Sequence, residues 1–207
     1  FPEANDEEKE RVQALLKGYM QMEEGYIVCS LETGGWQKDW LIEYWQALFE
    51  SLKDFGKKVI VVGSAPNRFK NVSFSNNVID LRGKTNLLET GYVIDNAELL
   101  INCCSFPVHI ANAMNTPVIG LYGSQPDYRC RPQRIYKSIY SKAPCAPCDM
   151  MFESSGRCDH PYCMDSITPE IVMNCVKKFY DEGMPLGDNN LKLIYKEKMP
   201  SELKREI

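Results

Sequence analysis

The sequence predicts an α/β protein: a Rossmann-like parallel sheet of about six strands with helices on both faces. Short apolar runs alternate along the chain with longer segments of helical periodicity, and the links between them are short. The apolar runs, such as residues 59–62, do not alternate with polar residues, which is typical of strands buried on both faces of a sheet. A chain of 207 residues is long enough for one such domain of full size.

The first part of the chain predicts two helices and two strands. An amphipathic helix over residues 6–20 precedes a short apolar strand at 26–31. Over residues 39–55, apolar side chains recur at intervals of three and four, which predicts a helix, and Gly56 follows its end as a cap. The second strand lies within residues 57–64.

The middle of the chain continues the alternation of strands and helices. Residues 65–77 have the composition of a loop, and a third short strand lies within 78–85. A helix is expected over 86–97 with Asn86 as its N-cap, followed by a fourth strand at 98–104.

The last part predicts a helix over 107–115, a fifth strand at 117–123 and a sixth within 134–141. A final helix follows, and its boundary signals are Thr168 as N-cap, Pro169 at the first helical position and Gly183 after the end. Residues 1–183 are therefore expected to form one domain. Residues 184–207 are polar and rich in lysine, which indicates a separate C-terminal tail.

Charge and hydropathy exclude several classes of function. The net charge of −4 argues against a nucleic-acid-binding surface, which needs a basic excess. The apolar runs are too short for a transmembrane segment, and the acidic N-terminus has no apolar core of a signal peptide. We expect a cytoplasmic protein, with the inner face of the membrane as an alternative location through a partner domain.

Two loops at the predicted carboxyl edge of the sheet suit an anionic ligand. In open parallel sheets, ligands bind at this edge, where helix N-termini favour phosphates. After the first strand, Gly34 and Gly35 allow unusual backbone angles and Lys38 adds a positive charge. After the fourth strand, Ser105 can cap the next helix and Pro107 suits its first turn.

His109 lies about one turn into that helix and has two interpretations. It is either a core histidine satisfied by a backbone carbonyl or a donor that faces a bound phosphate. The spacing alone does not distinguish them.

Four blocks in this order resemble the C-terminal half of the lipopolysaccharide heptosyltransferase family of glycosyltransferases. They are "KDWLIEYWQALFESLKDFGKKVIVVGS", "LRGKTNLLETGYVIDNAELLI", "VHIANAMNTPVIGLYGS" and a cysteine-rich segment, within residues 26–180. The resemblance implies a GT-B arrangement of two Rossmann-like domains across a cleft. The C-terminal half then binds the nucleotide-sugar donor, typically ADP-heptose, and an N-terminal domain holds the acceptor and the catalytic base.

The resemblance assigns donor-binding positions after the first strand. Lys38 matches the family lysine that contacts the donor phosphates. Thr33, with Gly34 beside it, falls in the phosphate-side turn of the same motif. The implied reaction transfers a heptose-like sugar to a glycan or lipid-linked acceptor with inversion at the anomeric carbon.

Further donor-binding positions follow the third and fourth strands. Gly83, Lys84 and Thr85 match the segment near the nucleobase. Ser105 and His109 match the hydroxyl and the imidazole of the family's Asp-Thr-Gly-x-x-His pattern at the pyrophosphate and sugar. By this resemblance, His109 faces the diphosphate. No catalytic residue is assigned to this chain.

Three departures from the family bear on the donor and on catalysis, and two of them, at Cys104 and Phe106, favour a rival hypothesis. The aspartate of the pattern is Cys104 here, its glycine is Phe106, and residues 63–71 lack the acidic residue that usually follows the second strand. The rival is a non-catalytic nucleotide- or partner-binding module that kept the fold. An acidic residue in an N-terminal glycosyltransferase half would favour the enzyme.

The segment "CAPCDMMFESSGRCDHPYC" predicts a metal knuckle over residues 145–163. Cys145, Cys148, Cys158 and Cys163 suit tetrahedral zinc or iron with a structural role, and His160 is a substitute ligand. Two disulfides or free thiols are the alternatives, and a reducing cytosol disfavours disulfides.

The other cysteines are scattered along the chain. Those with apolar neighbours are expected to be small buried side chains, and they are Cys29, Cys103, Cys104 and Cys175.

Overall fold

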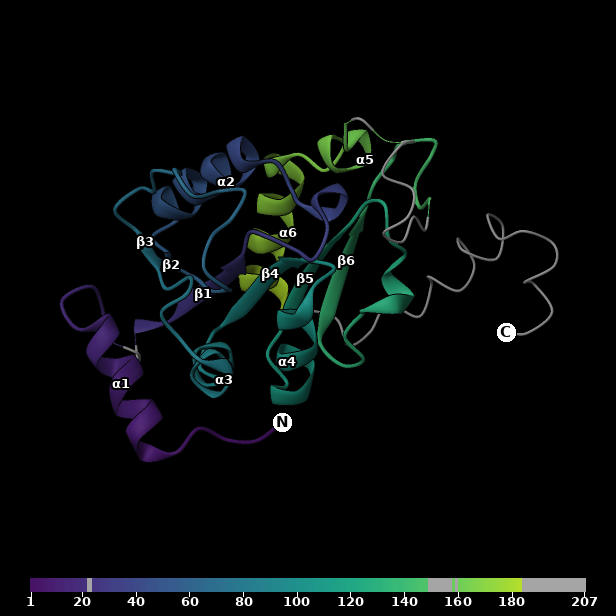
Figure 1. The fold of residues 1–207 in the computed structure, drawn as a ribbon. Helices are drawn as coiled ribbons and strands as arrows, with labels where there is room; N and C mark the ends of the chain where they lie inside the picture. The colour runs from purple at the N-terminus through teal and green to yellow at the C-terminus, as the bar shows by residue number, and fades with distance from the viewer. Residues whose placement is uncertain (22–23, 149–157, 159, 184–207) are drawn as a thin grey trace.

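The computed structural model describes residues 1–21, 24–148, 158 and 160–183, and it contains one parallel six-stranded sheet (Figure 1). The strand order is β3-β2-β1-β4-β5-β6, and every neighbouring pair is parallel. The strands are β1 Tyr26–Ser30, β2 Lys58–Val61, β3 Val78–Asp80, β4 Leu99–Cys103, β5 Val118–Tyr122 and β6 Tyr136–Tyr140. The predicted Rossmann-like sheet is therefore confirmed. The predicted tail at 184–207 lies outside the described residues.

Helices cover both faces of the sheet, with α2 and α6 on one face and α1, α3 and α4 on the other (Figure 1). The α-helices are α1 Asp6–Leu16, α2 Ile42–Asp54, α3 Leu87–Asp95, α4 Phe106–Met114, α5 Tyr162–Asp165 and α6 Pro169–Glu182. Two 3-10 turns, η2 Trp36–Lys38 and η3 Asp127–Arg129, complete the described elements.

The double covering explains why the strand residues are apolar without alternation. In β1, Ile27 and Cys29 pack in the cluster that contains α2 and α6, whereas Tyr26 and Val28 pack in the cluster that contains α1, α3 and α4. All five residues of β1 are buried. Successive side chains of a strand point to opposite faces, so both faces need apolar residues here.

Two helices begin at the N-cap residues that the sequence predicted. Asn86 caps α3 in a capping box with Glu89, and Thr168 caps α6 by accepting the N–H of Ile171. One predicted start is wrong, because α2 begins at Ile42 and not at residue 39. The backbone of Asp39 is extended, and its side chain accepts the N–H of Thr33.

The structure corrects the expectation for Cys104. Its side chain forms a disulfide with Cys130, so it is not a free buried hydrophobe. This bond joins the loop after β4 to the end of η3. Cys29 and Cys103 are buried as expected, and Cys175 is half-buried against the core.

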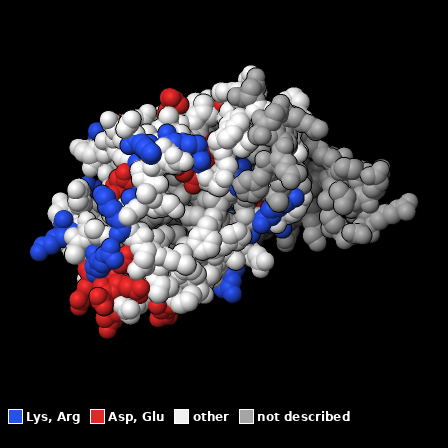
Figure 2. Space-filling model, viewed as in Figure 1, with Lys and Arg blue, Asp and Glu red and all other residues white. Residues whose placement is uncertain are grey.

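Charged side chains are unevenly distributed over the surface. Figure 2 shows acidic residues gathered over α1, whose first turn contains Asp6, Glu7 and Glu8. Carboxylates at this end of a helix are favoured by its dipole. Among the described helices, none combines the length and apolar content that a membrane crossing requires.

Candidate donor-binding site

A cavity of about 530 Å³ lies at the carboxyl ends of the central strands. The loops that follow β1, β2, β3 and β4 form its wall, next to the point where the strand order reverses between β1 and β4. The N-termini of α3 and α4 also reach it. The lining residues are Ser30, Glu32, Thr33, Gly34, Val62, Gly63, Ser64, Ala65, Asn67, Arg68, Arg82, Gly83, Thr85, Asn86, Leu87, Thr90, Ser105, Phe106 and Pro107.

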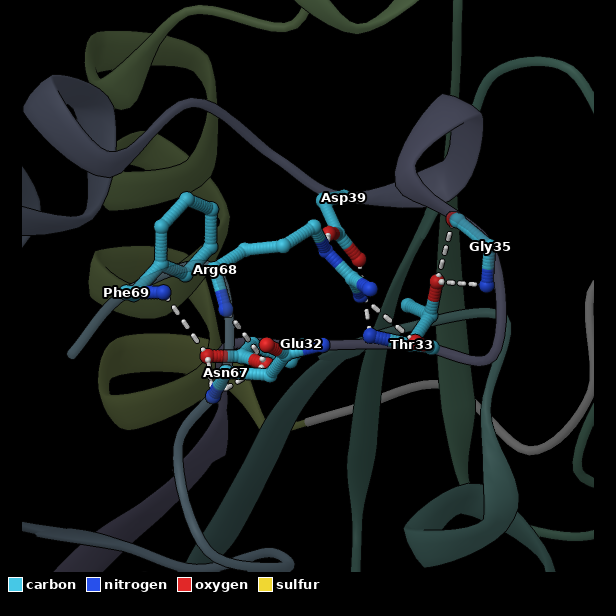
Figure 3. Close-up of polar contacts among 7 residues, drawn as sticks. All are labelled: Glu32, Thr33, Gly35, Asp39, Asn67, Arg68 and Phe69. Atoms are coloured by element: carbon cyan, nitrogen blue, oxygen red, sulfur yellow. Dashed lines mark hydrogen bonds and ion pairs between the residues drawn. The ribbon is translucent and has the colours of Figure 1, made fainter.

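Glu32, two residues after β1, fixes the loop that follows β2 (Figure 3). Its carboxylate accepts the backbone N–H groups of Asn67 at 3.0 Å, Arg68 at 3.3 Å and Phe69 at 2.9 Å. Three successive N–H groups around one anion form a small anion-binding concavity. The sequence places no carboxylate in the loop after β2, but folding brings this one to it.

Arg68 joins the same two loops through its side chain (Figure 3). Its Nε donates to the carboxylate of Asp39, and its Nη2 donates to the carbonyl oxygen of Thr33 at 2.6 Å. Asp39 also accepts the N–H of Thr33 at 2.7 Å. Burial raises the pKa of Asp39, while the hydrogen bonds from Arg68 and Thr33 act in the opposite direction.

Ser105 occupies the N-cap position of α4, but its hydroxyl does not cap the helix. Instead, its Oγ accepts a hydrogen bond from Nδ2 of Asn102 at 2.8 Å. The hydroxyl proton has no acceptor among the described residues, and the first-turn N–H groups of α4 have no side-chain cap there. The cavity thus contains donors that suit an anionic group.

The structure brings five of the eight predicted donor-binding residues together. Thr33, Gly34, Gly83, Thr85 and Ser105 all line the cavity, although they come from three different loops. The sequence resemblance and the cavity therefore coincide for these positions.

The other three predicted donor-binding residues lie outside the cavity wall. Lys38 is half-buried on η2, and burial lowers the pKa of its ammonium group. Lys84 is exposed and donates to the carbonyl oxygen of Asp80 at 2.7 Å. His109 is exposed on α4, so the core-histidine interpretation is wrong. Its predicted contact with a diphosphate stays a prediction.

Sequence reasoning missed Glu32, Asp39 and Arg68. The last two are 29 residues apart, and each is an ordinary charged loop residue in the sequence. The signal that could have found them is their position, since loops at the carboxyl ends of neighbouring parallel strands meet at one edge.

The thiols of the other three clustered cysteines lie close enough to Cys163 to affect its pKa. Cys163 is buried, and burial, followed by the nearby thiols of Cys148, Cys145 and Cys158, raises its pKa to about 12. No group of three or more His, Cys, Asp or Glu side chains in the described part of the chain is arranged to hold a metal ion. Within the predicted knuckle, residues 149–157 and 159 lie outside the described residues.

The imidazole of His160, the predicted substitute ligand, contacts two neighbouring side chains. Its Nε2 lies 2.5 Å from Oδ2 of Asp165, and its ring packs against Tyr162.

The parallel sheet and its strand order define a Rossmann-like α/β domain, and its cavity lies at the carboxyl edge, where such domains usually bind ligands. The sequence profile of glycosyltransferase family 9 (heptosyltransferase) matches residues 2–157. The chain belongs to this family.

Relatives of known name agree with this assignment. Lipopolysaccharide heptosyltransferase 3 from Escherichia coli strain K12 is 32% identical over 122 residues, which are 56% of this chain and 33% of the relative. The solved structure of E. coli ADP-heptose lipopolysaccharide heptosyltransferase II superposes with a TM-score of 0.65 at 20% identity, covering 84% of this chain and 51% of that one. The chain thus spans about half the length of such a heptosyltransferase.

A third relative carries a metal. The dodecameric, iron-containing glycosyltransferase TibC from enterotoxigenic E. coli shares the fold with a TM-score of 0.61 at 18% identity. The match covers 76% of this chain and 47% of TibC.

Proposed function

We propose that the chain is the donor-binding half of a glycosyltransferase that moves a heptose-like sugar from a nucleotide-sugar such as ADP-heptose to a glycan or lipid-linked acceptor. The observation that carries this proposal is the cavity of about 530 Å³ at the carboxyl edge of the sheet. Five positions that resemble donor-binding residues of the family line it, and two helix N-termini open into it.

In this proposal, the chain positions the donor and stabilises its leaving group. The N-terminus of α4 and the hydroxyl of Ser105 bind the diphosphate, whose negative charge grows as the sugar leaves. Gly83 and Thr85 lie at the end of the cavity that would bind the nucleoside of the donor. The acceptor and the catalytic base come from an N-terminal acceptor domain, which corresponds to the half of the relatives that this chain does not span.

Ser105 provides the first test of this function. We expect Ser105→Ala to weaken ADP binding by about 1.5–3 kcal/mol, because a hydrogen bond to a charged oxygen is lost. Ser105→Thr keeps the hydroxyl and should retain affinity close to that of the wild type. Isothermal titration of the full chain measures both, and equal affinity of all three proteins would contradict the assignment.

The same titration tests two of the three predicted donor-binding residues that lie outside the cavity wall. Lys38→Ala and His109→Asn should each lower the affinity for ADP if these side chains turn toward a bound diphosphate. His109 is exposed, so His109→Asn should change the melting temperature by no more than a few degrees. Unchanged ADP affinity would remove the residue concerned from the donor site.

The second candidate function is a nucleotide- or partner-binding module without transferase activity. The disulfide of Cys104 favours it, because the position that resembles the family aspartate carries no carboxylate here. The exposed ring of Phe106 on the cavity wall also favours it. Release of ADP from ADP-heptose by the full-length protein with its acceptor supports the enzyme, and nucleotide binding without turnover supports the module.

We also propose that Cys145, Cys148, Cys158 and Cys163 hold one structural zinc or iron ion. Four thiols suit either metal, the electrostatic proximity of the other three to Cys163 fits a shared site, and TibC is an iron-containing relative of the same fold. When bound, the metal would order a segment that has little apolar content of its own.

Metal analysis tests this cluster directly. Purified protein should contain about one zinc or iron ion per chain, and each Cys→Ser change in the cluster should lower that content. Cys175→Ser, half-buried outside the cluster, is the matched control and should leave it unchanged. Chelation should increase hydrogen exchange over residues 143–164 without unfolding the sheet. Metal-free protein, or unfolding of the whole chain on chelation, would contradict the metal or its local role.

For its location, we propose the cytoplasm, with the inner face of the membrane as the place where a lipid-linked acceptor is met. The disulfide between Cys104 and Cys130 is unusual for a reducing compartment. Fractionation of the source cells, with alkylation of free thiols at lysis, would locate the protein and report whether this bond exists there.

A further inference from the structure

The cavity contains a basic side chain that the sequence did not single out. Arg68 lies in the loop after β2 and lines the cavity together with Thr33 and Gly34. Its side chain is 31% exposed, so solvent and ligands can reach it.

Two contacts hold the guanidinium of Arg68 but use only part of its donors. Its Nε donates to Asp39 and its Nη2 to the carbonyl oxygen of Thr33. A guanidinium has five N–H donors, and Nη1 makes no hydrogen bond to any described residue. The remaining N–H groups are therefore available to an anion.

The backbone of Arg68 is fixed as well. The carboxylate of Glu32 accepts its N–H and those of Asn67 and Phe69 (Figure 3). Glu32 binds the backbone of Arg68 and Asp39 binds its guanidinium, so the arginine is already ordered when a ligand binds. Binding then costs less side-chain entropy than it would for a free surface arginine.

The other charged side chains of the cavity wall offer less to a ligand, because each guanidinium nitrogen of Arg82 already donates one hydrogen bond and its side chain is buried. Arg82 has a side chain that is 4% exposed and donates to Asp80 and to the carbonyl oxygen of Phe69. The oxygens of Glu32 accept three backbone N–H groups. Among the described residues that line the cavity, Arg68 is thus the cation that is both partly exposed and has a guanidinium nitrogen without a hydrogen bond.

Building on the donor-binding function proposed above, we infer that Arg68 binds the diphosphate of the nucleotide-sugar through the N–H groups that Asp39 and Thr33 leave free. Guanidinium groups match phosphate oxygens in geometry and form strong charge-assisted hydrogen bonds with them. Asp39 acts as a positioning residue, because it orients the guanidinium without touching the ligand.

The test compares ligands that differ in phosphate content. ADP, AMP and adenosine are titrated into the full chain and into Arg68→Gln, Arg68→Lys and Lys70→Ala. Lys70 is the matched control, since it is an exposed cation in the same loop that does not line the cavity. Adenosine binding is followed by ligand-observed NMR because its affinity is lower, and thermal unfolding checks each variant.

Arg68→Gln should bind ADP about 10- to 100-fold more weakly, with a smaller loss for AMP and a change of no more than about twofold for adenosine. Arg68→Lys should fall between Arg68→Gln and the wild type, and Lys70→Ala should match the wild type. The loss for ADP should shrink at high salt.

Two outcomes overturn the inference while leaving the donor-binding function intact. In one, Arg68→Gln binds ADP as the wild type does. In the other, it loses ADP and adenosine affinity equally, which would mean that the arginine only holds the loop. If the wild type binds neither ADP nor adenosine, the proposed function fails and this inference fails with it.

Discussion

Trp40→Ala is expected to lower the free energy of unfolding by about 3–5 kcal/mol. Trp40 is fully buried, and its ring centroid lies 4.9 Å from that of Trp45 and 5.7 Å from that of Tyr44, both in edge-on geometry. Its Nε1 donates to the carbonyl oxygen of Ile167 at 2.7 Å. Truncation leaves a large cavity and an unpaired carbonyl between α2 and the start of α6.

Denaturant unfolding followed by circular dichroism measures this loss. Trp40→Phe is the matched control, because it keeps an aromatic ring but not the N–H donor, and it should cost less than Trp40→Ala. A loss below about 1 kcal/mol for Trp40→Ala would show that α6 is not anchored through this residue.

Gly83→Ala is expected to lower the free energy of unfolding by about 2–5 kcal/mol and to weaken ADP binding. Gly83 has a φ of +70°, a conformation that costs an alanine about 1–2 kcal/mol. A Cβ at this position would also lie 2.9 Å from Cα of Ala65, and crowding of this kind adds about 1–3 kcal/mol. Both residues line the cavity, so relief of the clash moves its wall.

Gly56→Ala is the control for the cost of the backbone conformation without a steric clash. Its φ is +77°, and a Cβ there would meet no atom within 4 Å. Gly56→Ala should therefore show only the conformational cost and leave ADP affinity unchanged. Equal losses in the free energy of unfolding for the two alanine variants would mean that the clash between residues 65 and 83 contributes nothing to the loss.

Most of the sheet could be predicted because its signals are local. The apolar runs of β1 and β4 identify strands buried on both faces, and the positions of Asn86 and Thr168 mark helix starts through bonds to residues three positions later. The short elements were not predictable. The four residues of α5 are too few to show a helical period.

The candidate donor-binding site could be predicted only in part. The strand-end rule and the family resemblance pointed to Thr33, Gly83 and Ser105, which line the cavity and each follow a strand closely. The pairing of Asp39 with Arg68 could not be foreseen, because it depends on the packing of two loops against each other and not on any spacing within one of them. The disulfide of Cys104 was missed for the same reason.

The hydrogen bond between Trp40 and Ile167 also bears on the order in which the chain folds during its synthesis. The two residues are 127 positions apart, a distance that a ribosome covers in about 6–25 s at usual elongation rates. Helix α6, which packs on α2, emerges only after that interval. Until then, the apolar side of α2 lacks its final cover, and transiently exposed apolar surface of this kind makes a nascent chain prone to aggregation.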